Sequence, residues 1–244
     1  MRALLLALSL FIMGASFPVL AQAQETDDMG EVSDPMEGLN RGIFKVNDAL
    51  DRALLEPVAR GYRTMTPEGV RTGVRNFLRN LRSPINFANQ LLQGDFTGAG
   101  EQLLRTTVNT VFGIGLFDVA DSMGLKYEQE DFGQTLATWG VGDGPYIVAP
   151  ILGPTNARDL TGIAVDTYAD PIRLWLENTD RSHWYYTRVA ANTIDAREEL
   201  LDVISDLRKN SIDYYAAVRS TYAQRRAAMI RDEGYDANNA PDIP

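Results

Sequence analysis

The segment from Asp131 to Asp159 constrains the fold most, because it is strongly apolar and yet cannot form one continuous helix. Glycines and prolines interrupt it throughout, and both residue types break regular helices. The aliphatic and aromatic side chains between them are too apolar for a solvated loop, so we expect the segment to be buried in protein or lipid. In hydrocarbon an irregular backbone is tolerated only where it faces protein or a cavity, which would make this segment a pore wall.

The first residues have the form of a secretory signal peptide. Met1 and Arg2 precede the apolar stretch Ala3–Leu20, and Ala21-Gln22-Ala23 is an A-x-A cleavage site. The stretch is long enough to resemble a membrane helix, but the cleavage site and the acidic residues after it favour cleavage. We therefore predict a signal peptide over residues 1–23 and an acidic, flexible leader over residues 24–33. No later window reaches the ~20 apolar residues of a spanning helix.

Composition excludes several classes of function. The net charge of −10 disfavours nucleic acid as a partner. The absence of cysteine excludes disulfides, a thiol nucleophile, cysteine-ligated zinc and an N-terminal lipid anchor on cysteine. The single histidine, His183, lies between polar and aromatic residues without a nucleophile motif or ligand spacing, so we expect a structural or interfacial role for it. We predict no metal, no cofactor and no enzymatic activity.

Helical periodicity dominates the rest of the chain, and the predicted fold class is all-α. We expect the first helix to follow the turn Ser33–Pro35 and to end at Pro57 and Gly61, and we expect Pro84 to begin a separate helix. Residues 146–149 alone have the pattern of a short strand or hairpin arm, and the polar residues 234–244 are predicted to be disordered. The remaining predicted helices cover residues 68–82, 84–92, 98–112, 156–168, 171–176, 185–209 and 211–231.

Several short motifs, in their order along the chain, resemble those of the MlaA/VacJ family. The resemblance extends from about Asp34 to Arg226. The matching residues are Asp34, Pro35, Glu37, Asn40, Arg41, Phe44, Asn47, Asn76, Phe77, Asn80, Leu81, Leu92, Gln93, Gly94, Asp131, Phe132, Gly133, Thr135, Leu136, Gly144, Pro145, Tyr146, Gly153, Pro154, Arg158 and Asp159.

The resemblance implies a ring-shaped bundle of amphipathic helices over residues 34–233, embedded in the outer membrane of a Gram-negative bacterium on the periplasmic-leaflet side. Such proteins have a central channel, remove misplaced phospholipids from the outer leaflet and pass them to a soluble periplasmic carrier while bound to trimeric porins. Phospholipid is then the transported ligand. Many relatives are lipoproteins, whereas the residues at 21–23 indicate ordinary signal cleavage.

Three groups of candidate site residues follow. Apolar residues predicted to form the lipid path are Phe112, Ile114, Leu116, Phe117, Tyr146, Ile147 and Ile151. Residues predicted to give the backbone its freedom beside that path are Gly113, Gly115, Gly142, Gly144, Pro145, Gly153 and Pro154. Family-motif residues expected near the channel are Asn40, Arg41, Phe44, Asn47, Arg158 and Asp159.

Alternatives remain for several of these features. Ile114 and Ile147 could be core residues, and Asp159 and Asp166 could be structural caps or ion pairs. Arginines outnumber lysines twenty to three, and each could bind a lipid phosphate or simply pair with an acidic residue. Aromatic residues could form an interfacial belt or pack in the core; they are Trp175, Trp184, Tyr185, Tyr186, Tyr214, Tyr215 and Tyr222. The alternative function is a non-transporting envelope scaffold, with a phospholipase a distant third.

Overall fold

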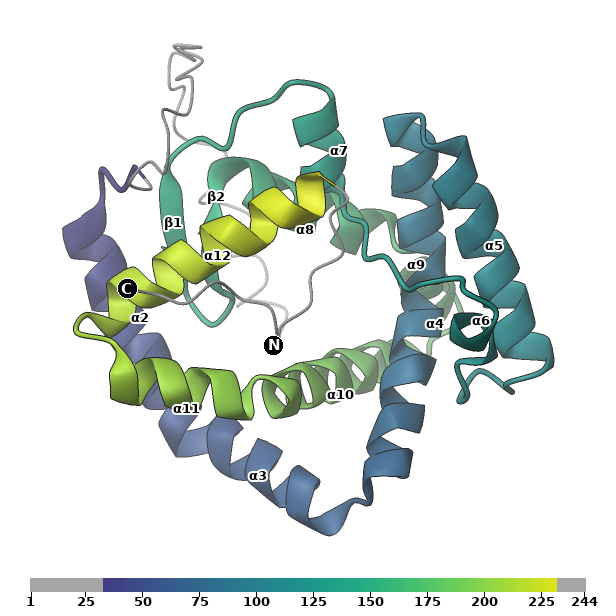
Figure 1. Cartoon of the computed structure of the whole chain (residues 1–244), viewed down its shortest axis with the longest axis horizontal. Helices are drawn as coiled ribbons and strands as arrows, with labels where there is room; N and C mark the ends of the chain where they lie inside the picture. The colour runs from purple at the N-terminus through teal and green to yellow at the C-terminus, as the bar shows by residue number, and fades with distance from the viewer. Residues whose placement is uncertain (1–32, 232–244) are drawn as a thin grey trace. The chain divides into compact units, whose positions relative to one another are not determined.

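Helices make up most of residues 33–231, which are the residues that the computed structural model describes (Figure 1). This confirms the all-α class. The predicted signal peptide, the leader up to residue 32 and the tail at 234–244 lie outside the described residues. The elements are α2 Glu37–Leu50, the π-helical turn η1 Asp51–Leu55, α3 Glu56–Met65, α4 Glu68–Gln93, α5 Phe96–Val111, α6 Val119–Ser122, α7 Phe132–Thr138, β1 Tyr146–Ala149, β2 Gly153–Asn156, α8 Ala157–Ala169, α9 Pro171–Asn178, α10 Ser182–Glu199, α11 Leu201–Asn210 and α12 Tyr214–Ile230.

Two prolines do not end helices where the sequence predicts an end. Pro57 directly follows the π-helical turn η1, whose residues and neighbours keep helical backbone angles, so helical structure continues from Glu37 to Met65 although position 57 donates no hydrogen bond. Pro84 lies inside α4, which therefore replaces two predicted helices. α4 contacts α5, α7 and α10, and such tertiary packing overrides a local preference.

Other helix boundaries agree with the predicted ranges, and side-chain caps explain two of them. The side chain of Asn156 accepts a hydrogen bond from the backbone N–H of Asp159 and begins α8, and Asp170 caps α9 in the same way. The predicted helix at 185–209 is divided at Leu200 into α10 and α11. The strand at 146–149 is confirmed and pairs antiparallel with β2, from Tyr146 opposite Asn156 to Ala149 opposite Gly153.

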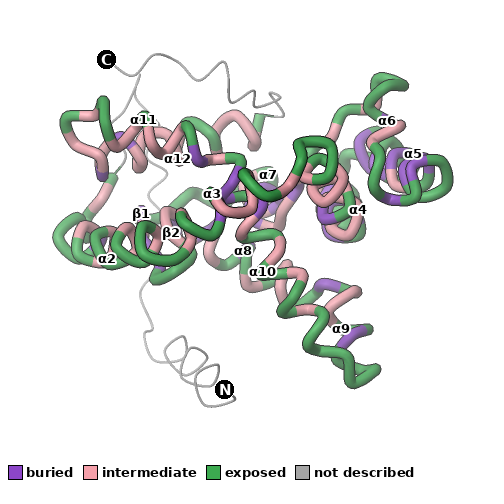
Figure 2. Tube along the Cα trace, turned by 90° about the horizontal axis from the view of Figure 1, so that it is seen from below, coloured by how far each residue is buried: buried purple, intermediate pink, exposed green. Residues whose placement is uncertain are grey.

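The described residues have an unusual distribution of polarity. Only 13 hydrophobic residues among them are buried, against 19 polar or charged ones, while 33 large hydrophobic side chains are exposed. Figure 2 shows exposed positions along nearly every helix. A water-soluble domain of this size would bury most of its large apolar side chains. The interior of this domain is largely polar, and its apolar faces point outward.

Helices α7 and α8 approach each other through two glycines. A Cβ atom on Gly162 of α8 would lie 2.3 Å from the backbone nitrogen of Gly133 in α7 and 2.8 Å from its Cα. Backbone atoms cannot yield as a flexible side chain can, so this contact requires glycine at position 162.

Replacement of Gly162 by alanine is therefore expected to lower the free energy of unfolding by about 2 kcal/mol or more. The matched control is Gly100→Ala in α5, where a Cβ meets nothing within 4 Å and the better helix former should add up to about 1 kcal/mol. Thermal unfolding followed by circular dichroism in mild detergent would measure both. Equal effects of the two substitutions would contradict the close contact.

Candidate functional site

Asparagines of α2 complete the hydrogen bonding of strand β1. The side-chain amide of Asn40 donates to the carbonyl of Tyr146, at 3.0 Å, and its oxygen accepts from the N–H of Val148, at 2.9 Å. Asn47 lies two turns further along α2 and binds the next part of the hairpin. Two helical turns rise by about 10.5 Å, which matches about three strand residues. The helix thus occupies the edge where a third strand would otherwise pair.

The second asparagine holds the tip of the hairpin. Asn47 donates to the carbonyl of Ala149 and accepts from the N–H of Ile151, each at 2.9 Å. Ile151 has a φ of 69°, and the N–H of Leu152 donates to the carbonyl of Pro150 at 2.8 Å, which is the geometry of a strained γ-turn. A β-branched residue in the left-handed region is a true outlier. The turn presents the Ile151 side chain, which is 81% exposed.

The turn after α5 presents a second isoleucine in the same way. Ile114 has a φ of 54°, Gly115 follows at 72°, and the N–H of Leu116 donates to the carbonyl of Gly113 at 2.9 Å, as in a type I′ turn. Asn76 of α4 donates to the carbonyl of Leu116 at 3.1 Å. Ile114 is 76% exposed. The segment at Gly113 and Gly115, predicted to give the backbone freedom beside the lipid path, is therefore a hydrogen-bonded turn, and its movement stays a prediction.

One face of α12 fixes the base of the hairpin and the start of α7. Its four inward residues recur at spacings of four, three and four: Tyr215, Arg219, Tyr222 and Arg226. Arg226 donates to Asp131, the N-cap of α7, at 2.7 Å and to Asp159 at 2.9 Å. Tyr222 donates to Asp159 at 2.5 Å. The interpretation of Asp159 as an ion-pair residue is confirmed.

The electrostatics of this cluster follow from burial and the arginine. Burial alone would raise the pKa of Asp131, but the hydrogen bonds and charge of Arg226 lower it below its ordinary value. Burial raises the pKa of Tyr146 to about 12. Burial and the hydrogen bond to Asp159 raise the pKa of Tyr222. The cluster therefore keeps Asp131 ionised and Tyr146 and Tyr222 protonated at neutral pH, which suits a structural joint.

Substitution of Arg226 should show how far the stability of the fold depends on pairing these carboxylates. A carboxyl group with a lowered pKa contributes stability above its unfolded pKa of about 4, and the contribution disappears as the pH falls through the folded pKa. Arg226→Met leaves the Asp131 carboxylate without its ion pair and leaves Asp159 with Arg158 alone, at 3.1 Å, so we expect a loss of about 3 kcal/mol at pH 7. The difference from the parent should shrink as the pH falls below about 4.

Urea unfolding in mild detergent between pH 3 and pH 7 measures this difference. The control is Arg52→Met, which removes a mostly exposed guanidinium paired within α2 and η1 with Asp48 at 2.7 Å and should cost less than about 1 kcal/mol. A pH-independent loss for Arg226→Met would contradict the assignment.

The two asparagines of α2 allow a second test. Asn47→Ala leaves the N–H of Ile151 without its acceptor, and we expect that amide to exchange with solvent about tenfold faster, corresponding to about 1.4 kcal/mol. Asn47→Asp keeps an oxygen acceptor at this position and should retain most of the protection. Hydrogen exchange with fragment or residue resolution reads both variants. Unchanged exchange in Asn47→Ala would show that the amide is protected by something else.

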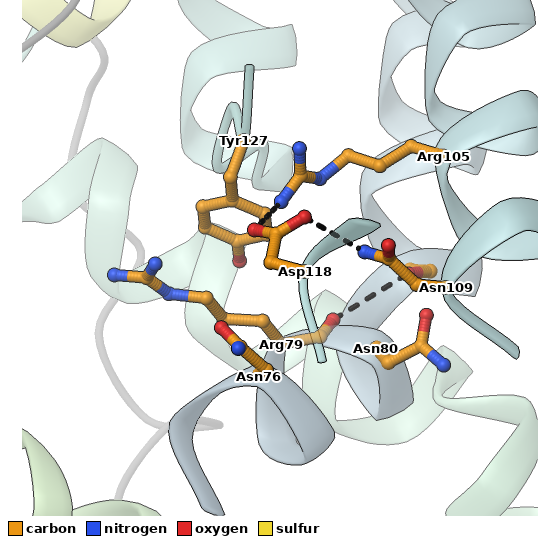
Figure 3. A pocket seen from close by; sticks show the side chains of 8 residues that line it. Asn76, Arg79, Asn80, Arg105, Asn109, Asp118 and Tyr127 are labelled. Carbon is orange, nitrogen blue, oxygen red and sulfur yellow. Dashed lines mark hydrogen bonds and ion pairs between the residues drawn. The ribbon is translucent and has the colours of Figure 1, made fainter. Parts of the chain in front are cut away.

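The pocket between α4 and α5 is a polar joint rather than a ligand site (Figure 3). Arg105 binds Asp118 and the carbonyl of Leu125, while Asn109 donates to Asp118 at 3.0 Å and accepts from the N–H of Ala120 at 2.9 Å. Burial would raise the pKa of Asp118, but the bond from Asn109 and the charge of Arg105 lower it. The remaining space holds no more than about one water molecule.

The arginines are used mainly inside the protein. At least fifteen of the arginines within residues 33–231 form ion pairs with carboxylates of the same part of the chain. Arg208 of α11 contacts three acidic residues of the first helices at 2.5 to 2.8 Å: Asp48, Asp51 and Glu56. Arg75 of α4 reaches Asp195 and Glu198 of α10, each at 3.0 Å. These arginines join helices, as the acid-pairing alternative predicts.

The structure brings some predicted site residues together and separates others. Phe44 packs against the cluster of Tyr146, Val148 and Tyr215, so Tyr146, 2% exposed, is a core residue. Arg41 pairs with Asp213 at 2.5 Å.

Other candidates lie near solvent or at special backbone positions. Ile147 is half-buried, and Phe112, Leu116 and Phe117 are exposed on the turn after α5. Gly144 and Gly153 adopt positive φ values of 68° and 86°. The lipid path itself stays a prediction. Sequence reasoning missed Arg219 and Arg226, although the spacing along α12 signals a common face.

Two properties of residues 33–231 bear on the class of protein. No helix within residues 33–231 is long and apolar enough to cross a bilayer. Within the same part of the chain, no group of three or more acidic, histidine or cysteine side chains is arranged to hold a metal ion. The fold defines a helical protein with a polar interior and apolar outer faces.

Comparisons with known proteins name the family. The model of the "MlaA lipoprotein" family matches residues 32–229, and the chain belongs to this family. It is 35% identical over 227 residues to the "Intermembrane phospholipid transport system lipoprotein MlaA" of Escherichia coli, covering 90% of this chain and 87% of that protein.

Two further matches agree. An uncharacterised protein of Rickettsia prowazekii is 37% identical over 202 residues, covering 82% of this chain and 79% of the other. A solved structure described by the words "Structural basis for maintenance of bacterial outer membrane lipid asymmetry" has a TM-score of 0.71 and 36% identity, covering 81% of this chain and 99% of that chain. The predicted resemblance is confirmed.

Proposed function

We propose that this chain acts in intermembrane phospholipid transport and maintains lipid asymmetry of a Gram-negative outer membrane. The names of its relatives support this, and so does the outward placement of 33 large hydrophobic side chains. Amphipathic helices with such faces lie within one leaflet when none of them spans the membrane. The inverted polarity is the observation that carries the membrane setting of this proposal, and the names of the relatives support transport over an envelope scaffold that does not move lipid.

The finer mechanism is a passive channel. We propose that the helices enclose an amphipathic passage through which phospholipid moves from the outer leaflet to a soluble periplasmic carrier, without an enzymatic step. Trimeric porins are the proposed neighbours in the membrane. The polar interior, joined by arginine pairs, would support a ring whose apolar surfaces contact lipid. The alternative remains an envelope scaffold that does not itself move lipid.

Anchoring is proposed to rest on the exposed helix faces after cleavage behind Ala23. Even ~600 Å² of embedded apolar surface supplies on the order of 15 kcal/mol before ordering costs. The decisive experiment is native mass spectrometry of protein purified in mild detergent, combined with transfer of labelled phospholipid from proteoliposomes to a soluble acceptor. Bound phospholipid and transfer above protein-free vesicles support the channel. A lipid-free protein without transfer supports the scaffold.

The exposed turn at Ile114 offers a directed test of the lipid path. Ile114→Asp places a carboxylate where acyl chains are proposed to pass, at a cost of several kcal/mol unless it reaches water. Aspartate tolerates the left-handed backbone better than isoleucine, so the fold should survive while transfer falls about tenfold or more, which corresponds to about 1.4 kcal/mol.

Ile114→Asn is the matched control, because it shares the backbone preference without the charge and should lose less transfer. Circular dichroism and expression level verify folding. Normal transfer by a well-folded Ile114→Asp protein would remove this turn from the lipid path.

A further inference from the structure

A corner formed by α9, its flanking residues and the start of α10 exposes large aromatic side chains. Tyr168, Trp175, Trp184 and Tyr186 are between 51% and 67% exposed. Figure 2 shows α9 at one edge of the described residues. We call these four residues the aromatic corner. Trp175, Trp184 and Tyr186 belong to the set for which the sequence left an interfacial belt and a core position open. Tyr168 is not in that set, and Tyr215 of that set is in the core.

The backbone of the aromatic corner is firmly held. Asp170 accepts hydrogen bonds from the N–H groups of Ile172 and Arg173, at 2.9 and 3.4 Å, and pairs with Arg188 of α10 at 2.7 Å. Leu176 is buried beneath α9. The exposed rings therefore belong to helices whose backbone is held in place, and not to a flexible loop.

The tryptophans of the corner differ from the third tryptophan in their hydrogen bonding. The indole N–H of Trp139 donates to the carbonyl of Leu92 at 3.0 Å. Among residues 33–231, neither Trp175 nor Trp184 finds an acceptor for its indole N–H. Both indoles thus combine an exposed apolar ring with a donor that needs an acceptor from outside the described chain.

Arginines add a positive charge beside the rings. The guanidinium of Arg181 lies 5.8 Å from the centre of the Trp175 ring, and no carboxylate of the described residues pairs with it. Arg173 lies 4.9 Å from the ring of Tyr168. Indole donors, tyrosine hydroxyls and a free guanidinium next to apolar rings match the glycerol and phosphate layer of a phospholipid leaflet, where acceptors and hydrocarbon meet.

We propose that the aromatic corner is an interfacial anchor that sets how deeply the protein sits in a phospholipid leaflet, an inference that rests on the membrane setting of the proposed function. Protein interfaces also favour tryptophan, tyrosine and arginine, but their anchors gather in one desolvated pocket. Here the rings are spread over three helices, and Val165, Leu174 and Val189 of the same three helices are exposed as well. A lipid layer fits this distribution better than a second protein.

Depth-dependent quenching of tryptophan fluorescence tests the anchor, since the chain has three tryptophans. The protein with W139F and W184F retains Trp175 alone, and the protein with W139F and W175F retains Trp184 alone. Each is reconstituted into phosphatidylethanolamine and phosphatidylglycerol vesicles that carry a spin label at the headgroup, at carbon 5 or at carbon 12 of the acyl chain. The headgroup or carbon 5 label should quench both tryptophans at least about twofold more than the carbon 12 label.

Several results would overturn the anchor. They are strongest quenching by the carbon 12 label, equal quenching at all three depths, and no quenching by any lipid label, which would point to a protein-facing corner. Circular dichroism verifies that each variant is folded. Flotation with the vesicles separates the two proposals: if the protein floats but its corner is not quenched as expected, only the anchor fails, and if it does not float, the membrane setting fails with it.

Discussion

Charge-assisted hydrogen bonds between arginines and buried carboxylates hold the helices of this protein together. Apolar side chains usually provide this cohesion, but here most of the large ones point outward. Arg197 of α10 therefore pairs with Asp51 of η1 at 2.6 Å, and Arg63 of α3 pairs with Glu198 of α10 at 2.8 Å. A guanidinium presents several donors in a fixed plane and can bind two helices at once. Loss of one member of such a network lowers the free energy of unfolding, because its partner stays buried and unpaired.

Local signals in the sequence predicted much of the fold and failed where distant contacts decide. The caps at Asn156 and Asp170 and the short strand were predictable, because each depends on neighbouring residues. The predictions at Pro57 and Pro84 were wrong, because tertiary packing and position within the helix outweighed the usual tendency of proline to end a helix. The partners of the arginines were beyond prediction, since pairs such as Arg197 and Asp51 are separated by 146 positions.

At the candidate site, too, local sequence could not predict what depends on distant contacts. A core position and a lipid-facing position both select large apolar residues, so sequence alone could not separate Tyr146, which is buried, from Ile114 and Ile151, which are exposed. What distinguishes the two isoleucines is their backbone, which has positive φ values at both. Strain of this kind persists only where surrounding contacts impose it, and the asparagines of α2 and α4 supply those contacts.

The asparagines of α2 bind only main-chain atoms of the hairpin. Recognition of a backbone does not depend on which side chains that backbone carries, provided that none of them is proline at a donating position. The side chains at the hairpin tip are thus free to change without loosening the attachment. The side chains at the hairpin tip can therefore vary among related proteins, to suit different membranes or neighbours, while the hydrogen bonds from Asn40 and Asn47 to the hairpin backbone stay the same.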